Sequence, residues 1–414
     1  MKHDRITFLF GSGADSCCAK ELGSGADFSK SILRNAYKDI IEKVAGKEYA
    51  TFLLIHPFST KVYIQTICDN PDEARKALGD HEIVEACLQY NMFGKDGLKK
   101  LRKYNSHTLI SEECRRWYDY IKSPKGKTQK AIADFFLHHA EFFDALDGKF
   151  NSLRRIDQKN KSYKKVMNAY WTIYLFMIDC LYGDKIKKIN NRAELYALLS
   201  EPYSVHTNEK TYYSLASQIE SNIATTNYTE LVNAAKHSPE QKVVFLHGKM
   251  TWFEDPKKLA VYDYTVPAER EKLERVEDSF PFILIPSGVK PLICPRQIRM
   301  FSDFTSFLDE SNELCIIGYR FNSEDNHINS IIGEWLQKSG RRLVFFNYKQ
   351  ETNTDVLFTT WLQGIHFEKI DGKEILADAK KCFDRINEIA GFVEITIDAE
   401  NSVDVFEKYI DGRK

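Results

Sequence analysis

The sequence predicts an α/β protein with a Rossmann-like, doubly wound parallel sheet and a large helical insertion. Two observations predict this fold class. Short, continuous apolar runs occur at residues 6–10 and again beyond residue 220, and each is followed by a turn or a helical pattern. Between them, residues 51–210 are charged and show helical periodicity. Short buried strands that alternate with helices are typical of a parallel sheet covered on both faces, so the helical stretch interrupts one Rossmann-like domain.

The predicted strands and helices follow in chain order. The first strand is Ile6–Phe10, the glycine-rich turn Gly11–Gly13 comes next, and a helical pattern begins near Asp27. Further apolar runs predict strands of the same sheet at residues 223–226, 243–246, 282–285, 314–317 and 343–346. The C-terminal tail carries a helical pattern over residues 373–389 and a strand pattern over residues 392–397.

Three regions follow from these patterns. Residues 1–50 and 211–355 form the discontinuous Rossmann-like domain, residues 51–210 the helical insertion, and residues 356–414 a C-terminal extension packed on the Rossmann-like domain. The most apolar stretch, residues 170–182, is shorter than the roughly 20 residues that span a bilayer, and it contains Asp179. We therefore expect a buried helix there and no association with a membrane.

The composition excludes several classes of protein. The 58 Lys and Arg residues balance 59 Asp and Glu residues, so the surface as a whole does not attract nucleic acid or anionic membranes. Local basic clusters are typical of solvated helix faces, and we expect no direct binding of nucleic acid. The nine cysteines are scattered without Cys-x-x-Cys spacing, which indicates reduced thiols in a cytoplasmic protein rather than a disulfide framework or a zinc ribbon.

The first group of candidate site residues is the turn after the first strand. Gly11, Ser12, Gly13 and Ala14 are small, and in a strand-to-helix turn such residues let backbone N–H groups approach a pyrophosphate. Asp15 is placed to reach a ribose. Alternatively, a tight strand-to-helix turn needs glycine whether or not a nucleotide binds. The turn is not a P-loop, because no Gly-Lys-Ser/Thr follows it.

Two polar residues follow the next two strands of the predicted sheet. Thr226 and Asn227 come after the strand at 223–226, at the sheet edge where ligands lie in open parallel sheets. Alternatively, Asn227 caps the next helix. His247 ends the following strand, and the ordinary pKa of a histidine suits a general base, although a lone histidine is more often structural.

Two later strands end in the same way. Gly318 and Tyr319 follow the strand at 314–317, and Asn347 follows the strand at 343–346. Each of these is an ordinary junction between a strand and a loop when taken alone. Because all of the junctions lie at the predicted ligand-binding edge, together they indicate one site.

The order of these motifs resembles the sirtuin-like family. The shared features are a Gly-x-Gly-Ala turn, a Thr-x-Asn motif, a strand ending in His-Gly, a Gly-Tyr motif and a late strand ending in Asn, over residues 5–45 and 220–350. The run Asp325–Asn329 is similar to a segment of bacterial sirtuin-like defence proteins. In that branch the fold is associated with cleavage of NAD and depletion of the nucleotide during phage infection.

The resemblance implies roles for individual residues. Asn227 and His247 match the catalytic pair, and Ser24–Phe28 faintly resembles a loop in which Phe28 covers the nicotinamide. The remaining cofactor-binding residues implied are Gly11, Ser12, Gly13, Ala14, Asp15, Thr226, Gly318, Tyr319 and Asn347. NAD would be the substrate, and no metal is expected.

Three departures from the deacylases of this family argue against an acyl-lysine peptide as substrate. Thr229 stands where those enzymes carry Asp, their four zinc-binding cysteines have no counterpart, and the helical insertion occupies a different place. The expected activity is therefore that of an NAD+ glycohydrolase, which releases nicotinamide and ADP-ribose. An NAD-dependent protein deacylase and a non-catalytic sensor of NAD or ADP-ribose are the alternatives.

The helical insertion bears on assembly. Its aromatic residues Tyr163, Tyr170, Trp171 and Tyr174 either offer a surface for self-association or a partner, or form the core of the insertion itself. Sirtuin-like proteins of this length resemble the partners of hexameric HerA-type translocase ATPases in defence operons. The resemblance therefore implies a homo-oligomer and a HerA-type ATPase as partner.

Overall fold

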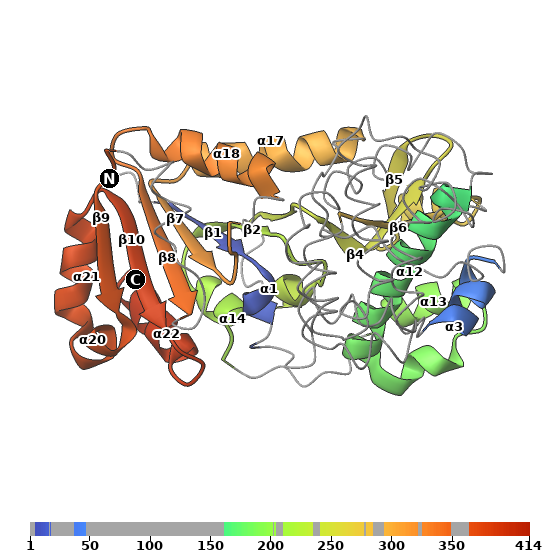
Figure 1. Ribbon diagram of the computed structural model, residues 1–414, viewed down its shortest axis with the longest axis horizontal. Helices are drawn as coiled ribbons and strands as arrows, with labels where there is room; N and C mark the ends of the chain where they lie inside the picture. The colour runs from blue at the N-terminus through green and yellow to red at the C-terminus, as the bar shows by residue number, and fades with distance from the viewer. Residues whose placement is uncertain are drawn as a thin grey trace, which may run out of the picture. The chain divides into compact units, whose positions relative to one another are not determined.

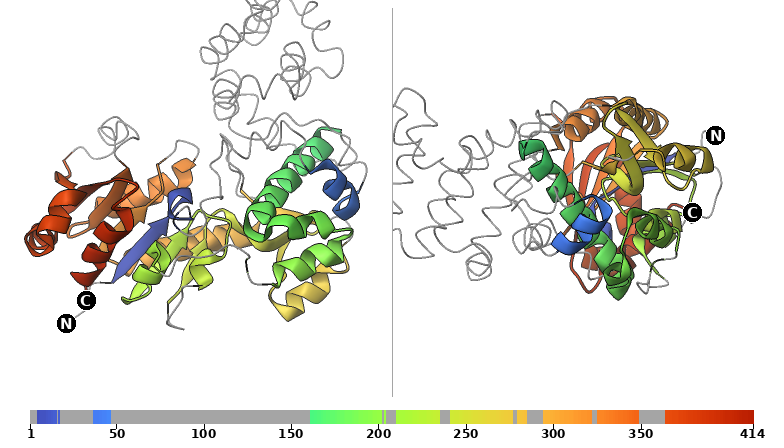
Figure 2. Two further views of the ribbon diagram at one scale, coloured as in Figure 1. Left: turned by 90° about the horizontal axis from the view of Figure 1, so that it is seen from below. Right: turned by 90° about the vertical axis from the view of Figure 1, so that its right-hand side faces the viewer.

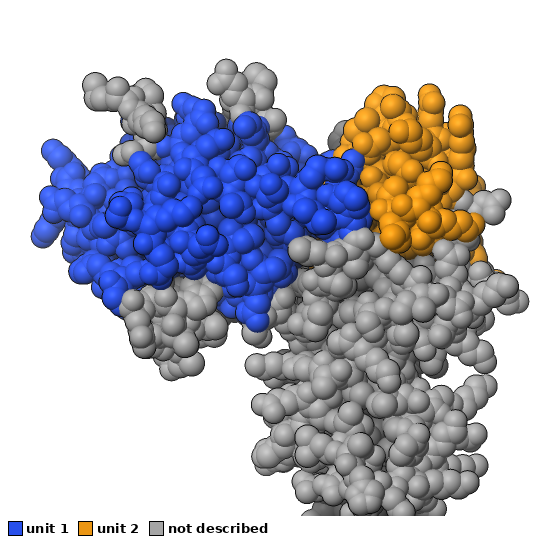
Figure 3. Space-filling model, turned by 90° about the horizontal axis from the view of Figure 1, so that it is seen from above, with its two compact units in different colours: residues 1–22, 203–250, 292–414 blue, residues 23–202, 251–291 orange. Residues whose placement is uncertain are grey.

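The computed structural model describes eleven stretches of the chain in two compact units. The described residues are 5–15, 17, 37–46, 161–201, 203, 210–234, 241–276, 279–284, 294–321, 325–348 and 364–414. Unit 1 comprises Met1–Leu22, Tyr203–Met250 and Leu292–Lys414, and unit 2 comprises Gly23–Pro202 and Thr251–Pro291 (Figure 3). The candidate residue Phe28 and most of the predicted helical insertion lie outside the described residues.

Unit 1 is built on a seven-stranded sheet in which all the paired strands run parallel, in the order β3-β2-β1-β7-β8-β10-β9 (Figure 1). The predicted α/β class with a doubly wound parallel sheet is therefore confirmed. The strands are β1 (Ile6–Phe10), β2 (Ser221–Thr225), β3 (Val243–Phe245), β7 (Glu313–Ile317), β8 (Arg342–Tyr348), β9 (Phe367–Asp371) and β10 (Gly391–Ile397).

Helices cover both faces of this sheet (Figures 1 and 2). They are α1 (Ser12–Asp15), α14 (Tyr212–Ala216), α15 (Leu231–Ala234), α17 (Pro295–Asp309), α18 (Asn326–Leu336), α20 (Gly372–Ala377), α21 (Ala379–Glu388) and α22 (Ser402–Asp411). The described residues 364–414 thus supply two further strands of the sheet, β9 and β10, as well as the helices α20, α21 and α22.

The central strand β1 shows why the predicted strands read as continuous apolar runs. Phe8 packs edge-on against Phe406 of α22, and Phe10 packs edge-on against Tyr213 of α14. On the opposite face, Thr7 Oγ1 donates a 3.0 Å hydrogen bond to the main chain of α17. All five residues of β1 are buried, because both faces of the sheet are covered.

Unit 2 contains a second, three-stranded sheet in the order β5-β4-β6. Its strands are β4 (Gly248–Asp255), which begins in unit 1, β5 (Ala260–Asp263) and β6 (Phe280–Ile283). Within the described residues, its helices are α3 (Lys38–Val44), α12 (Lys161–Tyr182), η4 (Gly183–Lys188), α13 (Arg192–Leu199) and α16 (Pro267–Leu273). The prediction that the strand at 282–285 joins the parallel sheet is wrong, since β6 pairs in this second sheet. A short apolar run predicts a buried strand but does not specify its partner.

The predicted buried helix at 170–182 is part of α12. Trp171 and Tyr174 are 1% and 0% exposed, and Tyr174 packs edge-on against Phe253 at a centroid distance of 5.7 Å. These two aromatic residues therefore belong to the core of unit 2. Across the described ranges, no helix is both long and apolar enough to cross a membrane.

Candidate active site

The carboxyl ends of the central strands lie side by side. In the register of the sheet Phe10 pairs with both Thr225 and Ile317, and Thr225 pairs with Phe245. Backbone hydrogen bonds continue past the strand ends, from Gly11 N to Ile317 O, from Thr226 N to Phe10 O and from Leu246 N to Thr225 O, at 2.9, 2.9 and 2.7 Å. The structure thus brings together the glycine turn, the Thr-x-Asn motif, the His-Gly turn and the Gly-Tyr turn at one edge.

The glycines at this edge allow two turns to pack backbone against backbone. A Cβ on Gly11 would lie 2.3 Å from Gly318 O, and a Cβ on Gly318 would lie 2.5 Å from Ala14 N. Gly318 also has a φ of +69°, in the left-handed region that favours glycine. A Cβ on Gly13 would also be too close, at 2.9 Å from Gly318 Cα. This contact alone requires glycine, so these residues are not by themselves a signature of a nucleotide site.

Asn227 is held in a single orientation by three acceptors. Its Nδ2 donates to Gly11 O at 2.9 Å, to Asp15 Oδ1 at 2.8 Å and to Tyr213 Oη at 3.0 Å. A main-chain carbonyl accepts hydrogen bonds and cannot donate them, so the amide nitrogen must face this side. The amide oxygen of Asn227 therefore points the other way.

Asp15 is the centre of this network. It is 5% exposed, and it accepts hydrogen bonds from Tyr213, Asn227 and Thr229, the last of these at 2.6 Å. Burial raises the pKa of the Asp15 carboxyl from 3.8 to about 6, although its hydrogen bonds act in the opposite direction. The sequence suggested that Asp15 reaches a ribose. In the structure both of its oxygens are engaged by side chains of the protein, and they orient Asn227.

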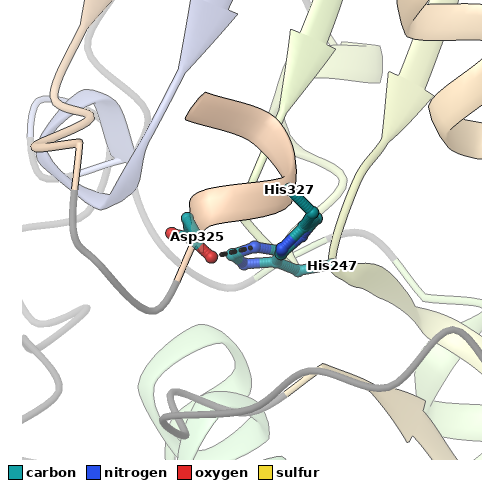
Figure 4. A group of neighbouring side chains, drawn as sticks. All are labelled: His247, Asp325 and His327. Atoms are coloured by element: carbon teal, nitrogen blue, oxygen red, sulfur yellow. Dashed lines mark hydrogen bonds and ion pairs between the residues drawn. The ribbon is translucent and has the colours of Figure 1, made fainter. Parts of the chain in front are cut away.

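His247 lies in the turn between β3 and β4 and contacts Asp325, which sequence reasoning did not select. His247 Nε2 is 3.0 Å from Asp325 Oδ1, and the two residues are 6% and 5% exposed (Figure 4). Asp325 is the N-cap residue of α18, but its side chain makes no capping bond to that helix. In a neutral histidine that donates Nε2–H to Asp325, Nδ1 is the ring nitrogen that carries the lone pair, and so it is the nitrogen at which the ring takes up a proton.

The third member of this cluster is His327, which is half-buried in the first turn of α18. Ligand atoms of His247, Asp325 and His327 all lie within 4.8 Å of one another. Asp325 and His327 come 78 and 80 residues after His247, so no local sequence motif predicts the cluster. The one available signal was the Asp-Asn-His run, which closely follows the Gly-Tyr turn at the same sheet edge.

The remaining predicted site residues form contacts within the protein. Tyr319 is buried, which raises the pKa of its hydroxyl well above the ordinary value, and Tyr319 Oη donates to Asn329 Oδ1 at 2.6 Å. Asn347 lies within β8 rather than after it, and its Nδ2 donates to Glu394 Oε1 at 2.9 Å. Ser12 is exposed and Ala14 is buried. The groups that converge at the edge are therefore Asn227 and His247, each fixed by a buried carboxylate.

Comparisons with known proteins show similarity to solved structures. No family model matches the chain, and no curated protein matches it. A solved structure described as "Structural Basis for the Mechanism and Regulation of Sir2 Enzymes" is similar over 56% of this chain and 76% of that chain, at 12% identity and a TM-score of 0.29. Agreement at that TM-score adds no argument about the site, so the fold class rests on the sheet itself.

The arrangement determines which chemistry the edge supports. Asn227 presents an amide oxygen, which orients a hydroxyl group or a water molecule by accepting its hydrogen bond. His247 lies on the neighbouring strand end and has a carboxylate partner that stabilises its imidazolium form. A fixed amide acceptor and a histidine on neighbouring strand ends form an arrangement suited to moving a proton from a bound hydroxyl or water.

Proposed function

We propose that the protein is an NAD+ glycohydrolase that releases nicotinamide and ADP-ribose. The observation that carries this proposal is the pairing of two fixed groups on neighbouring strand ends: Asn227, held by Asp15, and His247, held by Asp325. The order of the motifs along the sequence, which resembles the sirtuin-like family, supplies NAD as the substrate. NAD is consumed in the reaction, and the chemistry requires no other cofactor.

The chemistry follows from these two groups. The bond between nicotinamide and the ribose breaks with its electron pair leaving on nicotinamide, which departs as a neutral molecule, and positive charge develops on the ribose. Water oriented by Asn227 Oδ1 adds to the anomeric carbon, and His247 takes its proton. The Asp325 carboxylate stabilises the imidazolium that forms. His247 then returns the proton to solvent.

Two other activities use the same residues and differ in what they require. In an NAD-dependent deacylase, His247 activates a ribose hydroxyl, and nicotinamide is released only when an acylated peptide is present. A sensor binds NAD or ADP-ribose and releases no nicotinamide. Nicotinamide release measured with and without an acetyl-lysine peptide therefore separates all three functions.

Chromatography of nicotinamide released from NAD tests the proposal on the wild type, Asn227→Ala and His247→Ala. Loss of a general base costs about 10²–10⁴-fold in rate, so we expect His247→Ala to lose that much without unfolding. Asn227→Ala should also lose most of its turnover. Circular dichroism confirms that both variants fold. Full turnover in a folded His247→Ala variant would exclude this histidine as the base.

The biological setting is also part of the proposal. We propose that NAD depletion protects cells against phage, and that the protein acts as a homo-oligomer with a hexameric HerA-type ATPase. The support is the order of the motifs and the run Asp325–Asn329, which resembles bacterial sirtuin-like defence proteins. Light scattering of the purified protein, alone and mixed with a HerA-type ATPase, measures both assemblies. A protein that stays monomeric at high concentration and does not bind the ATPase would contradict both proposed assemblies.

A further inference from the structure

Two imidazoles and a carboxylate gather at the edge of the sheet, and the hydrolytic reaction uses only one of the imidazoles. His247 comes from the turn after β3, and Asp325 and His327 come from the start of α18 (Figure 4). Their ligand atoms all lie within 4.8 Å of one another. His247 and Asp325 are buried, whereas His327 is half-buried and so lies at the rim of the cluster.

This donor set is one that divalent transition metals use. Two histidines with one carboxylate bind Zn²⁺ in catalytic sites and Fe²⁺ in oxygenases. Two ligands held about 2.0–2.1 Å from one ion lie roughly 3–3.5 Å apart. His247 Nε2 and Asp325 Oδ1 already have this separation, at 3.0 Å. The ligand atom of His327 lies within 4.8 Å of these two, so its ring must move closer to complete the set; that ring packs edge-on against Phe301 at a centroid distance of 4.8 Å.

We infer that His247, Asp325 and His327 form a binding site for a divalent transition metal, Zn²⁺ in the first place, and that the bound ion switches off His247 as a base. Three protein ligands leave at least one position on the ion open to solvent. The set contains no cysteine, so the spacing of the cysteines in the sequence gives no sign of this site.

The inhibitory effect follows from the two nitrogens of one imidazole ring. In the metal-free protein, Nε2–H donates to Asp325 and the lone pair on Nδ1 accepts the proton of water. When Nε2 binds the ion, the ring proton moves to Nδ1, so the neutral imidazole retains no free lone pair. The ion also takes over the Asp325 oxygen that orients the ring. This consequence rests on the proposed function, whereas the metal site itself does not.

The test of the site uses the metal alone, without NAD. Chelator-treated protein is titrated with Co²⁺, whose visible absorption reports the ligand geometry, and with Zn²⁺ by calorimetry. We expect one equivalent to bind to the wild type and to His366→Ala, a control that removes an exposed histidine of the same unit. His327→Ala and the more conservative His327→Gln should bind at least about 100-fold more weakly. Equal binding by the wild type and both His327 variants, or no binding at all, would overturn the site.

A second measurement separates this inference from the proposed function. Nicotinamide release is followed with and without one equivalent of Zn²⁺. We expect Zn²⁺ to inhibit the wild type and His366→Ala, and to leave His327→Ala active. Activity that is unchanged or raised in the Zn²⁺-loaded wild type would overturn the inhibitory role. Metal binding in a protein that releases no nicotinamide even without metal would leave the site standing and exclude the glycohydrolase.

Discussion

The two ends of the parallel sheet both hold buried polar clusters, but the clusters differ in how their charges are paired. At the amino end, the carboxylate of Glu313 accepts hydrogen bonds from Arg342, Arg413 and Tyr409, and Glu313 is 1% exposed. At the carboxyl end, Asp325 pairs with His247, whose charge depends on a bound proton. A cluster that contains guanidinium groups stays charged at any physiological pH, whereas a histidine cluster exchanges protons.

This difference shows that burial and polarity do not by themselves identify an active site. Glu313 and its partners join the starts of β7 and β8 to the C-terminus of the chain, so they stabilise the fold. Asn227 and His247 lie where loops leave the carboxyl ends of the strands, the edge at which open α/β sheets bind ligands. Three substitutions sharpen the comparison.

The largest effect on stability is expected at the amino end. Glu313→Ala leaves two half-buried guanidinium groups without their buried carboxylate, and breaking a buried pair in this way costs about 3–5 kcal/mol. Glu310→Ala is the matched control, because Glu310 pairs with Arg5 at the surface and such pairs contribute about 0–1 kcal/mol. Urea denaturation gives the free energy of unfolding of both variants. Equal losses of this free energy would show that the Glu313 cluster stabilises the fold no more than a surface ion pair does.

A pH-dependent effect of intermediate size is expected at Asp15. Because burial raises its pKa from 3.8 to about 6, the folded protein binds the proton more tightly than the unfolded chain does. The free energy of unfolding contributed by Asp15 therefore falls as the pH rises from about 4 to about 6, by on the order of 3 kcal/mol.

Asp15→Asn isolates this contribution, since asparagine does not titrate. We expect the wild type to lose stability relative to Asp15→Asn as the pH rises through this window. Urea denaturation of both proteins at several pH values gives the difference, in which the other titrating groups cancel. A difference that stays constant between pH 4 and 6 would show that the carboxyl of Asp15 titrates as an exposed group.

The smallest effect concerns the contact between the two glycine turns. Gly318→Ala and Gly340→Ala both place a side chain at positive φ, of +69° and +74°, but only at Gly318 does the new Cβ meet backbone atoms. Overpacking typically costs about 1–3 kcal/mol. We therefore expect Gly318→Ala to lower the free energy of unfolding by that amount beyond Gly340→Ala. Thermal unfolding of both variants checks this, and equal destabilisation would mean that the turns separate easily.

Much of the sheet was predictable from the sequence. The runs at Ile6–Phe10 and at residues 223–226, 243–246, 314–317 and 343–346 all overlap strands of the parallel sheet, because strands buried on both faces are continuous apolar runs in the sequence. The strand pattern at 392–397 falls in the predicted C-terminal extension, whereas β10 belongs to the same sheet. The run at 282–285 is equally apolar but pairs with β4 in the smaller sheet. Which strand an apolar run pairs with depends on the tertiary path of the chain, and the local composition of the run does not specify that path.

The site was predictable in part. The strand ends placed Asn227 and His247 at one edge, since parallel strands share the direction of their carboxyl ends. The sequence did not predict that Asp15 orients Asn227 or that Asp325 and His327 meet His247. These contacts join residues separated by 212 and 78 positions, so they depend on the register of the sheet and on the start of α18.

The most direct test of the difference between the two ends is nicotinamide release per folded molecule, measured side by side for the wild type, His247→Ala and Glu313→Gln. Glu313→Gln keeps the size of the side chain and removes its charge. We expect Glu313→Gln to be less stable yet to release nicotinamide at close to the wild-type rate per folded molecule. His247→Ala should also be less stable, because the buried Asp325 loses its partner, but per folded molecule it should release about 10²–10⁴-fold less nicotinamide. A folded His247→Ala with full activity, or a stable Glu313→Gln with none, would contradict the assignment of catalysis to the carboxyl edge.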